Sequence, residues 1–131
     1  MEQAEQPDFL PIELNTVVLD CPDVAALSDF YIRLLGWKPS WKLDGQWADI
    51  ASPSGGVKLG FQKNEDYVPP VWPEAPGAQQ QMEHLDFRVA PENRERAVAH
   101  ALACGAKKAP EQFSDEWVVL LDPVGHPFCF V

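Results

Sequence analysis

The stretch Trp47-Ala-Asp-Ile-Ala-Ser-Pro-Ser-Gly-Gly56 is matched, about seventy positions later, by Trp117-Val-Val-Leu-Leu-Asp-Pro-Val-Gly-His126. In both copies a tryptophan opens an apolar run, and a proline and a glycine close it at equivalent positions. Upstream, 16–23 and 84–91 correspond in the same way, and each leads into a helical pattern that ends at a glycine. An open solenoid needs three or more repeats to bury its core, and only two copies are present. The sequence therefore predicts two related units packed into one domain.

Each unit is predicted to contain a strand, a helix and three further strands. In the first unit Pro22-Asp23 favours a helix start, Gly36 a helix stop and Asp44-Gly45 a two-residue hairpin turn. Strands are expected at 14–20, 37–43, 46–51 and 57–62, with the helix between 23 and 36. In the second unit strands are expected at 82–89, 107–113, 116–121 and 127–131, with the helix at about 92–104. We call 13–62 the first module, 63–81 the connecting loop and 82–131 the second module of a single domain spanning 1–131.

The connecting loop contains Tyr67-Val-Pro-Pro-Val-Trp-Pro-Glu-Ala-Pro-Gly77, whose four prolines exclude regular structure and make the segment stiff. One interpretation is a tether between the modules. The other is that Tyr67 and Trp72 fold back over a pocket, because aromatic side chains on a long surface loop would otherwise face water.

Composition limits the class of protein and of partner. The chain has 131 residues, 46% of them hydrophobic, which suits one domain with a proper core. Twenty acidic against ten basic residues give a net charge of -10, which argues against nucleic acid and anionic membranes as partners. The three cysteines are scattered in apolar stretches and are predicted to be reduced core thiols. Residues 1–8 show no leader pattern and no run approaches 18 apolar residues, so a cytoplasmic protein is expected.

The paired units, the Asp20-Cys-Pro-Asp23 junction before the first helix, the Leu35-Gly-Trp37 sequence after it and the two Pro-x-Gly turns resemble the vicinal oxygen chelate superfamily. This is the superfamily of glyoxalases, bleomycin resistance proteins and dioxygenases, and the chain is most similar to its small glyoxalase-like domain proteins. The resemblance covers 13–131. It implies an α+β fold in which two βαβββ modules lie side by side, forming a cupped eight-stranded mixed sheet with helices on the outer face. It also implies a homodimer.

The resemblance further implies one metal ligand from the first and the last strand of each module. Leucine cannot donate to a metal and threonine is a poor ligand, whereas a catalytic divalent ion usually takes about three protein ligands. Of the four corresponding positions, only the His84 imidazole and the Cys129 thiol then remain as ligands, unless Asp86 or Asp49 is recruited. The prediction is a lost metal site, and the alternative is a divalent metal ion held by His84 and Cys129. The four positions that correspond to the family's ligands are Thr16, Leu59, His84 and Cys129.

Alternation along the strands indicates which side chains face the cup. Leu85 and Phe87 form an apolar face suited to packing on a helix, so His84, Asp86 and Arg88 are expected on the opposite face. His84 is the best candidate for a catalytic base, with Arg88 as the nearby cation. Cysteine catalysis is disfavoured, because apolar neighbours raise the pKa of a thiol.

Five tryptophans in this chain favour an aromatic pocket with a few polar anchors, the usual form of a small-molecule site. The leading hypothesis is a glyoxalase-like protein that binds a small organic molecule. One alternative is a metal-dependent lyase, isomerase or dioxygenase of the same superfamily, and another is an interaction module whose cup a partner fills. The predicted pocket consists of Thr16, Trp47, Asp49, Leu59, Phe61, Trp72, His84, Asp86, Arg88, Trp117 and Cys129.

Overall fold

The computed structural model describes residues 11–131 and contains two βαβββ modules, as the repeat predicts. The first module comprises β1 (Thr16–Cys21), α1 (Val24–Leu35), β2 (Lys38–Leu43), β3 (Trp47–Ala51) and β4 (Lys58–Lys63). The second comprises β5 (Leu85–Phe87), a short 3₁₀ helix (Pro91–Asn93), α2 (Arg94–Cys104), β6 (Lys107–Lys108), β7 (Val118–Leu121) and β8 (Pro127–Phe130). The predicted α+β class and the paired-module organisation are confirmed.

Each module forms its own four-stranded mixed sheet, with strand order β1-β4-β3-β2 in the first and β5-β8-β7-β6 in the second. The first and last strands of each module pair in parallel, β1 with β4 and β5 with β8, and the other pairs are antiparallel. The two sheets therefore repeat one topology.

Helix α1 begins and ends where the sequence predicts. The Asp23 side chain accepts a hydrogen bond from the Ala26 backbone N–H at 3.1 Å, which satisfies one of the free donors of the first turn. Gly36 adopts φ 71°, a left-handed conformation that costs glycine little, and its N–H donates to the Ile32 carbonyl at 2.8 Å.

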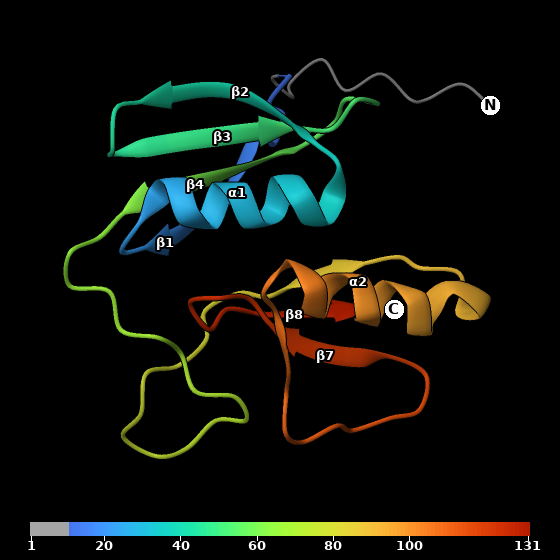
Figure 1. Cartoon of the computed structure of the whole chain (residues 1–131). Coiled ribbons are helices and arrows are strands. Elements are labelled where there is room, and N and C mark those ends of the chain that lie inside the picture. The colour runs from blue at the N-terminus through green and yellow to red at the C-terminus, as the bar shows by residue number, and fades with distance from the viewer. Residues whose placement is uncertain (1–10) are drawn as a thin grey trace.

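The main helix of the first module packs between the two sheets (Figure 1). Tyr31 stacks on Phe61 of β4 with ring centroids 5.6 Å apart, and Phe30 lies 6.2 Å from Phe128 of β8. Both sheets and both helices share one buried cluster. The eight strands were expected to form one cupped sheet with the helices outside, but α1 separates them into two sheets. The faces turned away from α1 consequently point in opposite directions.

Two elements of the second module are shorter than predicted. The strand expected at 107–113 is limited to Lys107–Lys108, because Pro110 has no backbone N–H to continue the pairing. The Gln112 side chain replaces the missing ladder: its amide donates to the carbonyls of Ala109 and Val119 and accepts from the Val119 N–H, each at 2.9 Å. The strand expected at 82–89 covers only Leu85–Phe87.

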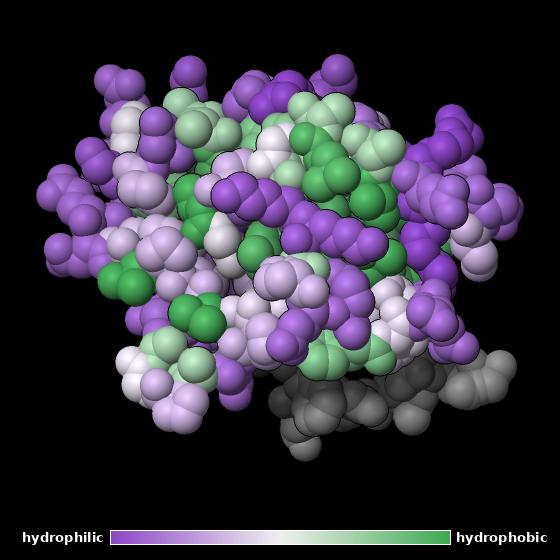
Figure 2. All heavy atoms as spheres, turned by 60° about the horizontal axis from the view of Figure 1, so that its bottom comes forward, coloured by the Kyte–Doolittle hydropathy of each residue, from purple (hydrophilic) through white to green (hydrophobic). Residues whose placement is uncertain are grey.

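Within residues 11–131, none of the helices has the length and apolar character needed to cross a membrane. The prediction that 1–8 carry no leader concerns residues outside the described range. Figure 2 shows hydrophobic residues in separate groups among hydrophilic ones on the face that it presents.

Candidate ligand-binding site

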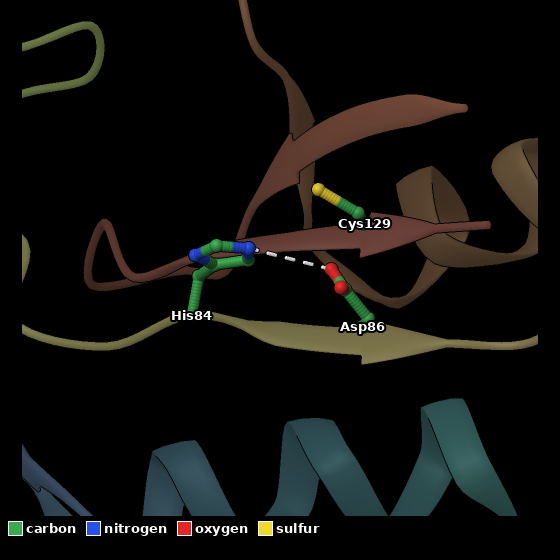
Figure 3. A group of neighbouring side chains, drawn as sticks. All are labelled: His84, Asp86 and Cys129. Carbon is green, nitrogen blue, oxygen red and sulfur yellow. Dashed lines mark ion pairs between the residues drawn. The ribbon is translucent and has the colours of Figure 1, made fainter. Parts of the chain in front are cut away.

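His84, Asp86 and Cys129 come together on the second sheet, on the face turned away from α1 (Figure 3). His84 directly precedes β5, Asp86 lies within it, and Cys129 is the register partner of Asp86 on β8. One ligand atom from each of the three lies within 4.8 Å of the others, and His84 Nε2 is 3.4 Å from Asp86 Oδ1. The strand alternation predicted this grouping, because Leu85, Phe87 and Phe128 pack into the core on the other face.

The Cys129 thiol is held in its protonated form. Burial raises its pKa, and the negative charge of Asp86 raises it further, to about 11. The side chain is 6% exposed. At neutral pH this cysteine is therefore an inert thiol rather than a nucleophile.

A cavity of about 470 Å³ opens over this group, and aromatic rings form much of its wall. The rings of Trp72 and Phe113 meet at 88° with centroids 6.2 Å apart, and Trp72 lies 6.2 Å from the His84 ring. Trp117 also borders the cavity and is 39% exposed. Trp72 belongs to the connecting loop, so this loop does fold over a pocket, as one interpretation of the sequence predicts.

Trp72 also presents an unpaired polar group. Its indole Nε1 is buried and has no hydrogen-bond partner among the described residues. A buried donor left without an acceptor costs on the order of 1–3 kcal/mol. Because this nitrogen is buried within the protein, the indole meets the cavity through other atoms of its ring.

Tyr67, the other aromatic residue that was expected to fold over a pocket, is used differently. The Tyr67 hydroxyl donates to the Val124 carbonyl at 2.8 Å, and its ring lies 5.4 Å from that of His126. His126 Nε2 in turn donates to the Asp20 carbonyl at 2.7 Å. Tyr67 therefore fastens the loop to the junction of the two modules instead of lining the cavity beside His84.

Three of the predicted pocket residues lie on the first module, away from His84. Trp47 packs over Gly60, its Nε1 donates to Asp49 Oδ2 at 3.1 Å, and the Thr16 methyl lies beside the same glycine. They share the face of the first sheet that is turned away from α1. None of the three lines the cavity of the second module.

Leu59 and Phe61 do not line a cup, contrary to prediction. Register pairs Phe61 with Ala48 and Leu59 with Ile50, which places all four on the face that packs against α1. Phe61 is fully buried beneath Tyr31. The position of β4 that corresponds to Cys129 is Gly60, so the first sheet offers no side-chain donor there.

The sequence interpretation missed Phe113 and Glu74, both of which border the cavity. Phe113 was assigned to the end of the expected strand 107–113, of which only Lys107–Lys108 forms. Its position as the single apolar residue within 111–116 was a signal that could have identified it. Arg88 is exposed and lies outside the cavity lining.

Two other cavities differ from this one in the residues that line them. A groove of about 620 Å³ beside α1, β2 and β3 is bordered by Trp41, Trp47 and Asp49 but by no histidine or cysteine. A cavity of about 320 Å³ lies between β1 and the connecting loop, near Asp20 and His126. Only the cavity above His84 combines aromatic walls with a His/Asp/Cys group among the described residues.

Comparison with protein families finds one match, to the model described as glyoxalase-like domain, over residues 16–131. No curated protein matches the chain.

Solved structures of similar fold are numerous. A glyoxalase/bleomycin resistance protein/dioxygenase family enzyme from Burkholderia phytofirmans PsJN is 22% identical, with a TM-score of 0.69, covering 91% of this chain and 97% of that one. A glyoxalase/dioxygenase from Nostoc punctiforme is 20% identical, with a TM-score of 0.67 and coverages of 99% and 96%. A mutant of the fosfomycin resistance protein FosX from Listeria monocytogenes, complexed with Mn(II) and 1S,2S-dihydroxypropylphosphonic acid, is 11% identical, with a TM-score of 0.69 and coverages of 93% and 90%. At these identities the likeness establishes the fold.

Proposed function

This chain belongs to the glyoxalase-like domain family, and from that premise we propose that it binds a small organic molecule in the aromatic cavity of its second module. The observation that carries the proposal is the cavity of about 470 Å³, which Trp72, Phe113 and Trp117 border together with His84. Small-molecule sites are concave and mostly apolar, with a few polar groups that orient the ligand. Trp72, Phe113 and Trp117 supply the apolar wall, and His84 supplies a polar anchor.

A ligand screen tests this proposal directly. Ligand-observed NMR with a set of small aromatic molecules carrying one acceptor oxygen should identify binders, and calorimetry should measure their affinity. Trp72→Phe replaces the indole with a smaller ring, which reduces the apolar wall of the cavity, and should weaken the best binder roughly fivefold or more. Trp41→Phe, on the exposed surface of β2, is the matched control and should change nothing. Equal affinity of both variants for every binder would contradict the proposal.

A metal-dependent lyase, isomerase or dioxygenase is the second candidate, and the His84, Asp86 and Cys129 group favours it. One imidazole, one carboxylate and one thiol suit a zinc-like ion with a fourth position open. Such an ion would act as a Lewis acid on a substrate oxygen. The three residues would hold it only after Cys129 lost its proton, against the effects that raise its pKa to about 11. While His84 ligates the ion it has no free lone pair to accept a proton, so His84 is the candidate base only for a reaction without the metal.

Metal content separates the two functions. Protein purified without a histidine tag or a chelator should contain no stoichiometric transition metal if the first proposal holds. About one equivalent that is lost in both His84→Ala and Cys129→Ser would support the metal-dependent function instead. Asp49→Asn, on the other module, is the control and should retain any metal.

We also propose that the protein is a homodimer. The outer faces of the two sheets point in opposite directions, so a cup built from both requires the first-module face of one chain to cover the second-module face of another. Trp47 over Gly60 would then lie opposite His84 and Cys129. Light scattering at micromolar concentration should give twice the mass of 14.6 kDa. A strictly monomeric protein that still binds ligand would overturn this part alone.

Three free buried cysteines support the proposal of a reducing, cytoplasmic location.

A further inference from the structure

The cavity of the second module has the chemistry of a cage for an organic cation. We infer that its ligand, on the premise of the small-molecule function proposed above, is a small alkylated ammonium ion. Two features of the cavity carry this inference: the arrangement of its aromatic rings and the charges around them.

The rings present their faces from different directions. Trp72 and Phe113 stand at 88° to each other, and Trp117 and His84 border the same space. The face of an aromatic ring is the negative part of its quadrupole, so a cation within about 6 Å of several ring centres is attracted by each of them. Perpendicular walls allow one ligand group to meet more than one face, which a stacked pair would not.

The charges of the site have one sign. Glu74 borders the cavity, and Asp86, which is outside the lining, lies 3.4 Å from His84. No lysine or arginine is found among the cavity-lining side chains within 11–131, and the nearest candidate in sequence, Arg88, forms no ion pair with Asp86 there. An anionic ligand would therefore meet the Glu74 carboxylate with no lysine or arginine in the lining to offset its charge.

Three probes test the inference: choline, its neutral isostere 3,3-dimethylbutan-1-ol, and the smaller cation tetramethylammonium. Calorimetry and ligand-observed NMR should show that both cations bind, and that choline binds roughly tenfold more tightly than the neutral alcohol. Phe113→Leu keeps apolar bulk and removes one ring face. Because Phe113 is 56% exposed, the variant should fold normally. Its affinity for choline should fall roughly 2- to 30-fold, whereas its affinity for the neutral alcohol should not change.

Glu74→Gln should weaken choline and leave the alcohol unchanged, and Trp41→Phe should affect neither. If the alcohol binds as tightly as choline in this cavity, the cation inference is overturned while the small-molecule function stands. If neither probe binds, the cation inference also fails. The screen of aromatic molecules then decides separately whether the pocket function survives.

Discussion

The Tyr31 hydroxyl donates a hydrogen bond to Asp122 Oδ2 at 2.8 Å, joining α1 of the first module to the turn before β8 of the second. Both side chains are buried, and Asp122 is 2% exposed. The other carboxylate oxygen, Oδ1, accepts from the backbone N–H groups of Val124 and His126 at 3.0 and 2.9 Å. One carboxylate thus shapes the turn and ties it to the helix between the sheets.

Tyr31→Phe should lower the free energy of unfolding by about 1–3 kcal/mol, because it leaves a buried carboxylate oxygen without its donor. Urea titration followed by fluorescence measures this loss. The Tyr31→Phe/Asp122→Asn double variant serves as the control, since its effect should be smaller than the sum of the two single effects. Simple additivity would mean that the bond does not couple the modules energetically.

Asp122 should also make stability depend on pH. Burial, the largest cause, raises its pKa above the ordinary value near 3.9, although the neighbouring His126 and the Tyr31 hydrogen bond act in the opposite direction. Between the unfolded and folded pKa values the native protein binds more protons than the unfolded chain. This group therefore adds stability at low pH that is lost as the pH rises through its folded pKa.

The comparison that isolates this effect is wild type against Asp122→Asn, measured by urea unfolding across that pH window. The stability of wild type relative to the variant should increase as the pH falls. Other groups, such as Glu83, whose pKa is also raised by burial, are present in both proteins and cancel. A difference that grows as the pH rises would have the wrong sign and would refute the prediction.

Cys129 should react slowly with iodoacetamide. With a pKa of about 11, roughly one thiol in a thousand is ionised at about pH 8. Asp86→Asn removes the nearby negative charge, lowers the pKa of Cys129 and should accelerate its labelling at fixed pH. Mass spectrometry of the modified peptide gives the rate. Asp49→Asn, on the first module, should leave that rate unchanged, and an equal acceleration in both variants would point to general loosening.

Gly60→Ala should disturb the outer face of the first sheet. An added Cβ would lie 2.8 Å from the Trp47 ring and 3.0 Å from the Thr16 methyl, so the indole must move, which strains its hydrogen bond to Asp49. We expect a loss of about 1–3 kcal/mol in stability, seen as a lower Tm. Trp47→Leu in the same chain should relieve the clash, so that Gly60→Ala costs less in that background. Equal costs in both backgrounds would show that the clash lies elsewhere.

The resemblance between 47–56 and 117–126 was sufficient to predict the paired modules, because each copy carries its own helix, turn and strand signals. Local alternation also predicted that His84, Asp86 and Cys129 share a face, since successive strand residues point to opposite sides whatever surrounds them. The helix ends at Asp23 and Gly36 were predictable for the same reason: capping is a property of a few neighbouring residues.

The remainder depended on contacts between distant residues. Phe61 was assigned to the wrong face because its side depends on its register with Ala48, which nothing local fixes. Phe113 and Glu74 reach the cavity from segments without periodicity, so no sequence pattern places them. The sequence alone determined the two modules and the polar group on the second sheet. Only the tertiary structure, by packing α1 between the sheets, decided that the two outer faces point apart and that the loop around Trp72 completes the pocket.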